Sequence, residues 1–133
     1  MNGMPIELTV VLDDVPGALA QLGKALGDAR VNIEAIQGMS REGKGVVRFV
    51  PEDTDGAARA LDAVHIAFTT REVLLVKVLD EPGTLGDVAL VMATAGINID
   101  AVYVTTRGRL VLSVDDLDGA VHVAEGLAVM TLE

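Results

Sequence analysis

The sequence contains no cysteine and no tryptophan, and its aromatic residues are limited to one tyrosine and two phenylalanines. Without cysteine, disulfides, thiolate metal sites and cysteine nucleophiles are excluded. Basic residues are also few, so the formal net charge is −10. That charge would repel a phosphate backbone, and Tyr103, Phe49 and Phe68 offer little surface for base stacking. We therefore expect no direct binding of nucleic acid.

Long apolar runs are missing as well. Half of the residues are hydrophobic, yet no run approaches the roughly 18 uninterrupted apolar residues that a membrane span needs. The first ten residues, MNGMPIELTV, have neither the basic start nor the apolar core of a signal peptide. We expect the apolar excess to be buried inside protein, with no membrane association and a cytoplasmic location.

One cassette of residues occurs twice. The sequence DVPGAL at Asp14–Leu19 is followed by Asn32 and Ile33, and DEPGTL at Asp80–Leu85 is followed by Asn98 and Ile99. The two copies match at a constant offset of 66 positions, from Pro16 to Pro82 for example, with no gap. A repeat of this length in a chain of 133 residues predicts two very small units. We place them at residues 5–70 and 71–133.

Each repeat carries the same order of expected elements. In the first, these are a strand at 6–13, a helix at about 17–29, a strand at 31–39, a hairpin loop at 40–45, a strand at 46–51, a helix from Thr54 and a strand at 65–70. The second repeats this order between residues 73 and 132. The βαββαβ order predicts the α+β class, with two tandem ferredoxin-like units, each a four-stranded antiparallel sheet with two helices on one face. No linker rich in glycine or serine separates them, so we expect the units to pack together.

No pattern predicts a metal, a cofactor or a catalytic residue. His65 and His122 are isolated in the sequence. Two acidic clusters, around Asp53 and Asp116, could bind a divalent cation, but their position at helix starts is explained by capping. The segment REGKG at Arg41–Gly45 lacks the Ser or Thr of a phosphate-binding loop and precedes a strand. We predict no cofactor.

The element order together with the cassette resembles the ACT domain, and two copies resemble tandem-ACT proteins that carry no catalytic domain. The resemblance covers nearly the whole chain. It implies binding of a free amino acid or a similar small metabolite at the loop between the first strand and the first helix, usually at a contact between two ACT units. The ligand-binding residues that it implies are Asp14, Val15, Pro16, Gly17, Ala18, Leu19, Asn32, Ile33, Asp80, Glu81, Pro82, Gly83, Thr84, Leu85, Asn98 and Ile99.

The same residue types suit an amino acid physically. A turn before a helix presents free N–H groups to a carboxylate, and Asp14 or Asp80 could receive the ammonium group. Asn32 and Asn98 supply both donors and acceptors. A purely structural explanation stays open, because Pro-Gly forms turns, aspartate caps helices and asparagine tolerates unusual backbone angles.

The second loop is expected to bind more readily if one of the two is occupied. It has Thr84 where the first loop has Ala18, and Gly96 where the first repeat has Arg30. Tyr103, Thr105 and Thr106 add polar groups to the strand that follows.

Three functions remain open from the sequence. The favoured one is a non-catalytic amino-acid-binding protein that regulates a separate enzyme or regulator of amino-acid metabolism. An acylphosphatase-like enzyme shares the fold, but neither Arg30 nor Arg41 lies in a convincing phosphate-binding turn. A purely structural oligomerisation module is the third. Apolar residues on both sides of several strands, as in LVLSV at Leu110–Val114, also predict a homodimer.

Overall fold

The computed structural model describes residues 4–126 and 130–132, which form two compact units. One unit is Ile6–Arg71, and the other is Glu72–Glu133 together with Met1–Pro5. The backbone N–H of Val73 donates to the carbonyl of Pro5 at 3.0 Å, and Met4 packs against the core of the second unit. Pro5 therefore belongs to the second unit, whereas the sequence pattern placed it at the start of the first.

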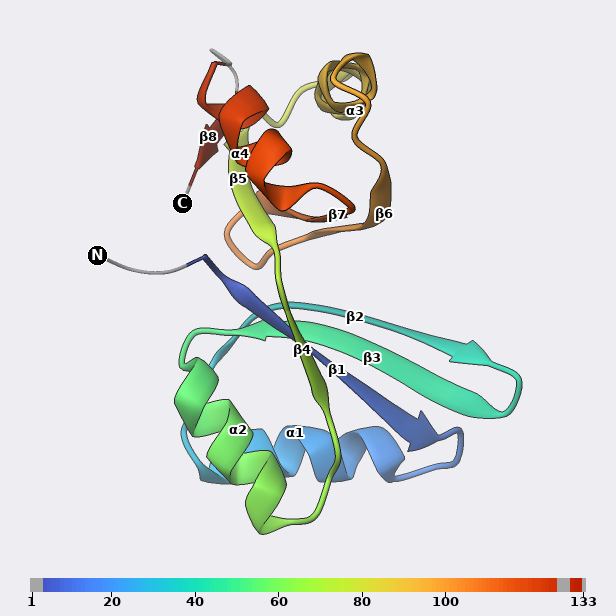
Figure 1. The fold of residues 1–133 in the computed structure, drawn as a ribbon. Coiled ribbons are helices and arrows are strands. Elements are labelled where there is room, and N and C mark those ends of the chain that lie inside the picture. The colour runs from blue at the N-terminus through green and yellow to red at the C-terminus, as the bar shows by residue number, and fades with distance from the viewer. Residues whose placement is uncertain (1–3, 127–129, 133) are drawn as a thin grey trace. The chain divides into compact units, whose positions relative to one another are not determined.

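The first unit has two helices on one face of an antiparallel sheet (Figure 1). The strand order is β2-β3-β1-β4, and β3 pairs antiparallel with both β1 and β2. Its elements are β1 (Ile6–Asp13), α1 (Ala18–Asp28), β2 (Ile33–Arg41), β3 (Lys44–Pro51), α2 (Thr54–Ala63) and β4 (Thr69–Glu72).

The core of the first unit lies between this sheet and its helices. Leu8 and Val10 alternate along β1 and are fully buried, and Phe49 of β3 pairs with Leu8 in register. Leu22 and Leu26 of α1 pack onto the same cluster. Leu19 shares their helical spacing but lies in the first turn of α1 and is 59% exposed.

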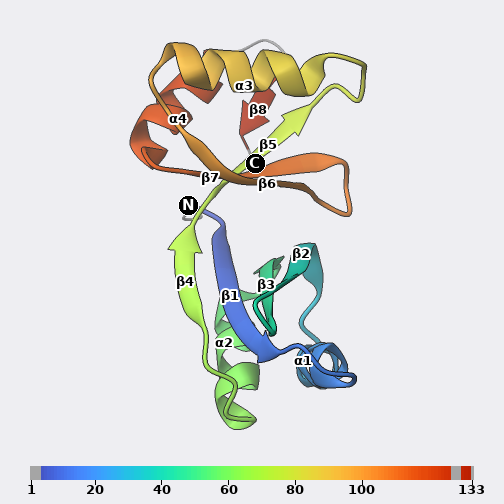
Figure 2. The ribbon, with the colours of Figure 1, turned by 90° about the vertical axis from the view of Figure 1, so that its right-hand side faces the viewer.

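The second unit repeats the order, with α3 and α4 on one side of its sheet (Figure 2). Its elements are β5 (Leu74–Val78), α3 (Thr84–Thr94), β6 (Ile99–Val104), β7 (Arg109–Val114), α4 (Leu117–Glu125) and β8 (Met130–Leu132). The strand order is β6-β7-β5-β8, in which β8 contributes three residues. Part of the last strand expected in the second repeat lies outside the described residues. Within them, no helix is long and apolar enough to cross a membrane.

The core of the second unit repeats the pattern of the first. Leu74 and Val76 of β5 are fully buried, as is Leu112 of β7, while Val88 and Met92 of α3 supply the helix side of the cluster. Because adjacent residues of a strand point to opposite faces, Leu74, Val76 and Leu112 share the face toward α3 and α4. Leu75 and Val111 lie on the other face and are also buried.

The first hairpin is tighter than the sequence indicated. The expected loop at 40–45 is reduced to Glu42 and Gly43, because β2 continues to Arg41 and β3 begins at Lys44. Glu42 has φ 52° and Gly43 has φ 80°. Two successive residues with positive φ match the type I′ turn, whose twist follows that of the paired strands. The polar residues that read as a longer loop are therefore mostly strand residues.

Aspartate caps begin the second helix of each unit, as the sequence predicted. The Asp53 carboxylate accepts a hydrogen bond from the Gly56 N–H at 2.9 Å, and the Asp116 carboxylate accepts one from Gly119 at 3.0 Å. A Cβ at either glycine would lie 2.3 Å from a carboxylate oxygen of its cap. Within the described residues, no group of three acidic or histidine side chains could hold a metal ion.

The first helix of each unit ends in a residue with left-handed backbone conformation. That residue is Arg30, with φ 59°, in the first unit and Gly96, with φ 75°, in the second. In both, the next N–H reaches back to a helix carbonyl at 2.9 Å, from Val31 to Leu26 and from Ile97 to Met92. This is the helix-ending arrangement that favours glycine. The Arg30/Gly96 difference thus concerns helix termination and not the preceding loop.

Replacing Arg30 by glycine should stabilise the first unit. A left-handed conformation strains a residue that carries a Cβ, and glycine removes that strain at some entropic cost, so Arg30→Gly should add about 0.5–1 kcal/mol to the free energy of unfolding. Urea denaturation followed by circular dichroism measures it. The matched control Gly96→Ala should lower stability by about 1 kcal/mol. A loss of stability in Arg30→Gly would contradict this account.

Candidate functional site

The loop between the first strand and the first helix has the same conformation in both units. The Ala18 N–H donates to the Val15 carbonyl at 3.3 Å, and the Thr84 N–H donates to the Glu81 carbonyl at 3.2 Å. Each closes a four-residue turn with proline second and glycine third. Gly17 has φ 92° and Gly83 has φ 95°. These features define a type II turn, in which only glycine takes the third position without strain.

Neither turn provides a side-chain cap for the helix that follows. Gly17 and Gly83 occupy the N-cap positions of α1 and α3, and neither helix has a side-chain hydrogen bond at its cap. The structural explanation that Asp14 and Asp80 serve as caps is therefore wrong, while the Pro-Gly turn is confirmed. The N–H groups of Ala18 and Thr84 close the turns, and the N–H groups that follow them in each helix, which no side chain caps, stay available to an anion.

A cavity of about 450 Å³ lies beside this loop in the first unit. Its lining comes from three segments: the end of β1 with the loop, the first turn of α1, and the hairpin ends of β2 and β3. Most of the lining is apolar, with carboxylates from Asp13 and Asp14 and a hydroxyl from Ser40. The lining residues are Leu12, Asp13, Asp14, Val15, Ala18, Leu19, Ile36, Gly38, Met39, Ser40, Gly45 and Val47.

The second unit has the corresponding cavity, but it measures only about 230 Å³. Asp80, Glu81, Thr84 and Leu85 stand where Asp14, Val15, Ala18 and Leu19 stand in the first unit, each offset by 66 positions. The cavity is completed by Val78, Leu79, Val104, Gly108 and Leu110. The smaller volume runs against the expectation that the second loop is better suited to a ligand.

Pro16 and Gly17 line a different hollow. This third cavity, of about 430 Å³, shares Asp13 and Val15 with the first cavity and extends to Gln21, His65 and Ile66. Pro82 and Gly83 line neither of the loop cavities described above. In both units the Pro-Gly pair therefore shapes the turn, while its neighbours face the cavity.

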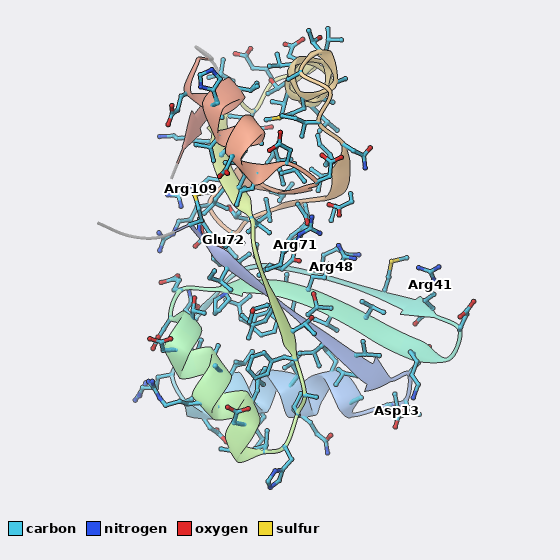
Figure 3. The ribbon with its side chains drawn as sticks, in the orientation of Figure 1. Asp13, Arg41, Arg48, Arg71, Glu72 and Arg109 are labelled. Carbon is cyan, nitrogen blue, oxygen red and sulfur yellow. The ribbon has the colours of Figure 1, made fainter. Side chains whose placement is uncertain are left out.

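Asn32 and Ile33 lie far from the loop of their own unit. Register places Lys44 opposite both Asp13 and Arg41, whereas Ile33 pairs with Pro51 at the other end of the sheet. Seven residues of β3 separate the two ends, which is about 23 Å at strand geometry. Figure 3 shows Asp13 and Arg41 at the same end of this unit. Asn32 and the first loop therefore cannot contact one amino acid within a single unit.

The same separation holds for Asn98 and Ile99. Ile99 pairs with Val114, while the loop end of the sheet lies near Arg109, which pairs with Lys77. Five residues of β7 span about 17 Å. The structure thus places the loop residues on either side of each Pro-Gly pair at one cavity and the asparagines at the opposite end of the sheet.

Both asparagines take part in local hydrogen bonds. The Asn32 carbonyl accepts from the Glu52 N–H at 3.0 Å, and its side-chain amide donates to the Glu52 carboxylate. The Asn98 N–H donates to the Asp115 carboxylate at 3.0 Å, and its carbonyl accepts from the Asp115 N–H at 3.2 Å. These bonds join the connection before the second strand to the start of the second helix.

Thr105 is used by its hairpin. Its hydroxyl oxygen accepts hydrogen bonds from the N–H groups of Arg107 at 3.1 Å and Arg109 at 3.0 Å. The side chain is buried and does not line the loop cavity of the second unit. The expectation that it adds a polar contact for a ligand is not supported by this geometry.

Sequence reasoning missed the part of the cavity that comes from the hairpin. Gly38, Met39 and Gly45 lie 19 or more positions from Leu19, and only the antiparallel register of β1, β3 and β2 brings them beside the loop. Asp13 was assigned only as the end of a strand. Its carboxylate forms an ion pair with Lys44 at 2.7 Å.

The sequence model of the ACT domain matches residues 6–68 and 73–125, one match in each unit. The chain belongs to the ACT-domain family. Its two ACT units together account for most of the sequence, which confirms the resemblance that the repeated cassette indicated. No curated protein matches the chain.

Solved structures show the same tandem ACT fold. Protein BT0572 from Bacteroides thetaiotaomicron superposes with a TM-score of 0.88 at 21% identity, covering 97% of this chain and 92% of that one. The ligand-free regulatory subunit of aspartate kinase from Thermus thermophilus gives 0.69 at 18% identity, covering 92% and 91%. The regulatory subunit from Thermus flavus gives 0.62 at 16% identity, covering 91% of each chain.

The ion pair at the cavity should be visible in the titration of Asp13. The hydrogen bond and the positive charge of Lys44 lower the pKa of the Asp13 carboxyl below its ordinary value of 3.8. Stabilisation from this pair is therefore present above that ordinary pKa and is lost as the pH falls through the lowered pKa of the folded protein. We expect the ¹³C titration of the carboxyl group to show this direction.

The variant Lys44→Met should raise the Asp13 pKa toward its ordinary value. Lys24→Met is the matched control, because Lys24 pairs with Asp28 at 3.2 Å on the exposed face of α1. It should leave the Asp13 titration unchanged. An Asp13 pKa that stays low in Lys44→Met would assign the shift to another group.

Proposed function

We propose that this tandem ACT protein is a non-catalytic regulatory protein that binds a free amino acid in the cavity beside the first loop of an ACT unit. The observation that carries the proposal is the recurrence of one cavity, at corresponding residues, in both units. A turn needed only for folding would not require an apolar hollow beside it twice.

The chemistry of the cavity suits a zwitterion with an apolar side chain. Within the described residues, the carboxylates of Asp14 and Asp80 are exposed and have no hydrogen-bond or salt-bridge partner. Either can receive an ammonium group in a charge-assisted hydrogen bond. The uncapped start of α1 or α3 offers N–H donors to the carboxylate, and the apolar walls accept the side chain.

Asn32 and Asn98 fit this proposal as residues that reach the ligand from a second ACT unit. Each lies at the end of the sheet opposite its own loop. An asparagine and a loop can therefore contact the same ligand only if they come from different units. We therefore propose a homodimer.

The geometry favours regulation over the acylphosphatase-like alternative. That chemistry needs an arginine and an asparagine at one phosphate. Arg41 lies at the loop end of its sheet, whereas Asn32 lies at the other end, and Arg30 ends α1. We propose that the protein acts in the cytoplasm on an enzyme or regulator of amino-acid metabolism present as a separate chain.

A ligand screen tests the binding. Thermal unfolding of the full chain should shift to higher temperature with at least one of the twenty amino acids, because a ligand that binds only the folded state stabilises it by mass action. Nucleotides and acetyl phosphate serve as comparison ligands. A shift with acetyl phosphate, together with its hydrolysis, would favour the enzyme instead. No shift with any amino acid would overturn the proposal.

Variants locate the site. Asp14→Asn and Asp80→Asn should each remove a charged hydrogen bond, at a cost of about 1.5–3 kcal/mol, or roughly 10- to 150-fold in affinity at the loop concerned. Calorimetry measures both. Asp28→Asn is the control, since Asp28 lies at the far end of α1. Asn32→Ala and Asn98→Ala test the shared site: unchanged affinity in both would confine the ligand to one unit.

A further inference from the structure

We infer that one position in the second strand of each ACT unit sets which amino acids that unit accepts, and that the two units therefore differ in specificity. The position is Gly38 in the first unit and Val104 in the second. On this inference the first unit takes an amino acid with a long or branched apolar side chain, such as leucine or methionine, and the second takes a small one. The inference rests on the proposed amino-acid binding and deepens it.

Register and offset establish that the two positions correspond. Gly38 pairs with Val47, which in turn pairs with Val10 of β1. Val104 pairs with Leu110, which pairs with Val76 of β5. Gly38 and Val104 are 66 positions apart, the offset of the repeated cassettes. Each lines the cavity of its own unit.

The two cavities differ in the direction that these side chains predict. The cavity with glycine measures about 450 Å³ and the one with valine about 230 Å³. Valine places an isopropyl group where glycine places none. Ala18 in the first unit and Thr84 in the second add to the difference, because threonine is the larger residue and brings a hydroxyl.

Gly38 is free to carry a side chain without damage to the fold. A Cβ built there would meet Val47 Cγ2 at 3.7 Å and the Val46 carbonyl oxygen at 3.9 Å, both ordinary contacts. Its φ lies outside the left-handed region, so no backbone strain demands glycine. The space beside Gly38 is therefore open to a ligand, and a valine introduced there would occupy that space.

The walls of the larger cavity match an apolar side chain. Leu12 and Ile36 lie on the same face of the sheet as Gly38 and border the space beside it. Asp13 is paired with Lys44, which leaves Asp14 as the carboxylate for the ammonium group at the cavity.

Exchange of the two residues provides the test. Calorimetry with the full chain would compare L-leucine and L-methionine with glycine and L-alanine, for the wild type, Gly38→Val and Val104→Gly. Gly38→Val should weaken leucine and methionine binding about 10-fold or more and affect the small amino acids less, because lost space costs most for the largest side chain. Val104→Gly should increase the affinity of the second unit for L-leucine and L-methionine.

Gln37→Val is the matched control. Gln37 is the neighbour of Gly38 in β2, points to the other face of the sheet and does not line the cavity. This variant adds a valine to the same strand and should keep the wild-type preference. Circular dichroism would confirm folding, and if Gly38→Val fails to fold, Val104→Gly decides the question.

The outcomes separate the two proposals. Amino-acid binding with unchanged preference in both exchange variants would overturn the specificity inference and leave the proposed function standing. A wild-type protein that binds no amino acid would overturn both. A loss of leucine and alanine binding by the same factor in Gly38→Val would also count against specificity, because a general disturbance of the site predicts it.

Discussion

The type II turn after the first strand of each unit is the constraint on which the site depends. Gly17 and Gly83 hold nearly identical positive φ values, and this conformation lets the chain reverse within four residues. The reversal starts the helix at once and leaves its first N–H groups without a side-chain cap. It also holds the adjacent aspartate at the cavity. One backbone conformation thus determines where the helix starts, which of its N–H groups have no side-chain cap, and which aspartate lies at the cavity.

The repeat preserves this arrangement while allowing its contents to change. The backbone of the loop is kept in both units, and so are the buried leucine and valine positions of the first strands. The cavities beside the loops nevertheless differ about twofold in volume. Packed cores tolerate little change in side-chain volume, whereas a side chain at an exposed edge such as Val104 can vary without disturbing the core. The repeat therefore has two cavities beside the same turn that differ in volume and lining.

The pattern of residues predicted most of the fold because the signals were local. The short apolar runs of β1 and β5, the spacing of Leu22 and Leu26, and the capping aspartates Asp53 and Asp116 each act within a few residues. The sequence pattern predicted the structure less well where a residue other than glycine has a positive φ. Glu42, with φ 52°, lies in a tight turn that the sequence pattern predicted as a longer loop.

The amino-acid sequence by itself determined the tandem organisation, the order of strands and helices and the Pro-Gly turns, since repetition and short-range stereochemistry express all three. Only the tertiary structure decided what surrounds the turns. The antiparallel register places Gly38 and Met39 beside the loop and Asn32 at the opposite end of the sheet. In the sequence, by contrast, Asn32 belongs to the same repeated cassette as the loop. Proximity in such a sheet depends on strand pairing, which joins residues far apart in the chain and separates residues that are close in it.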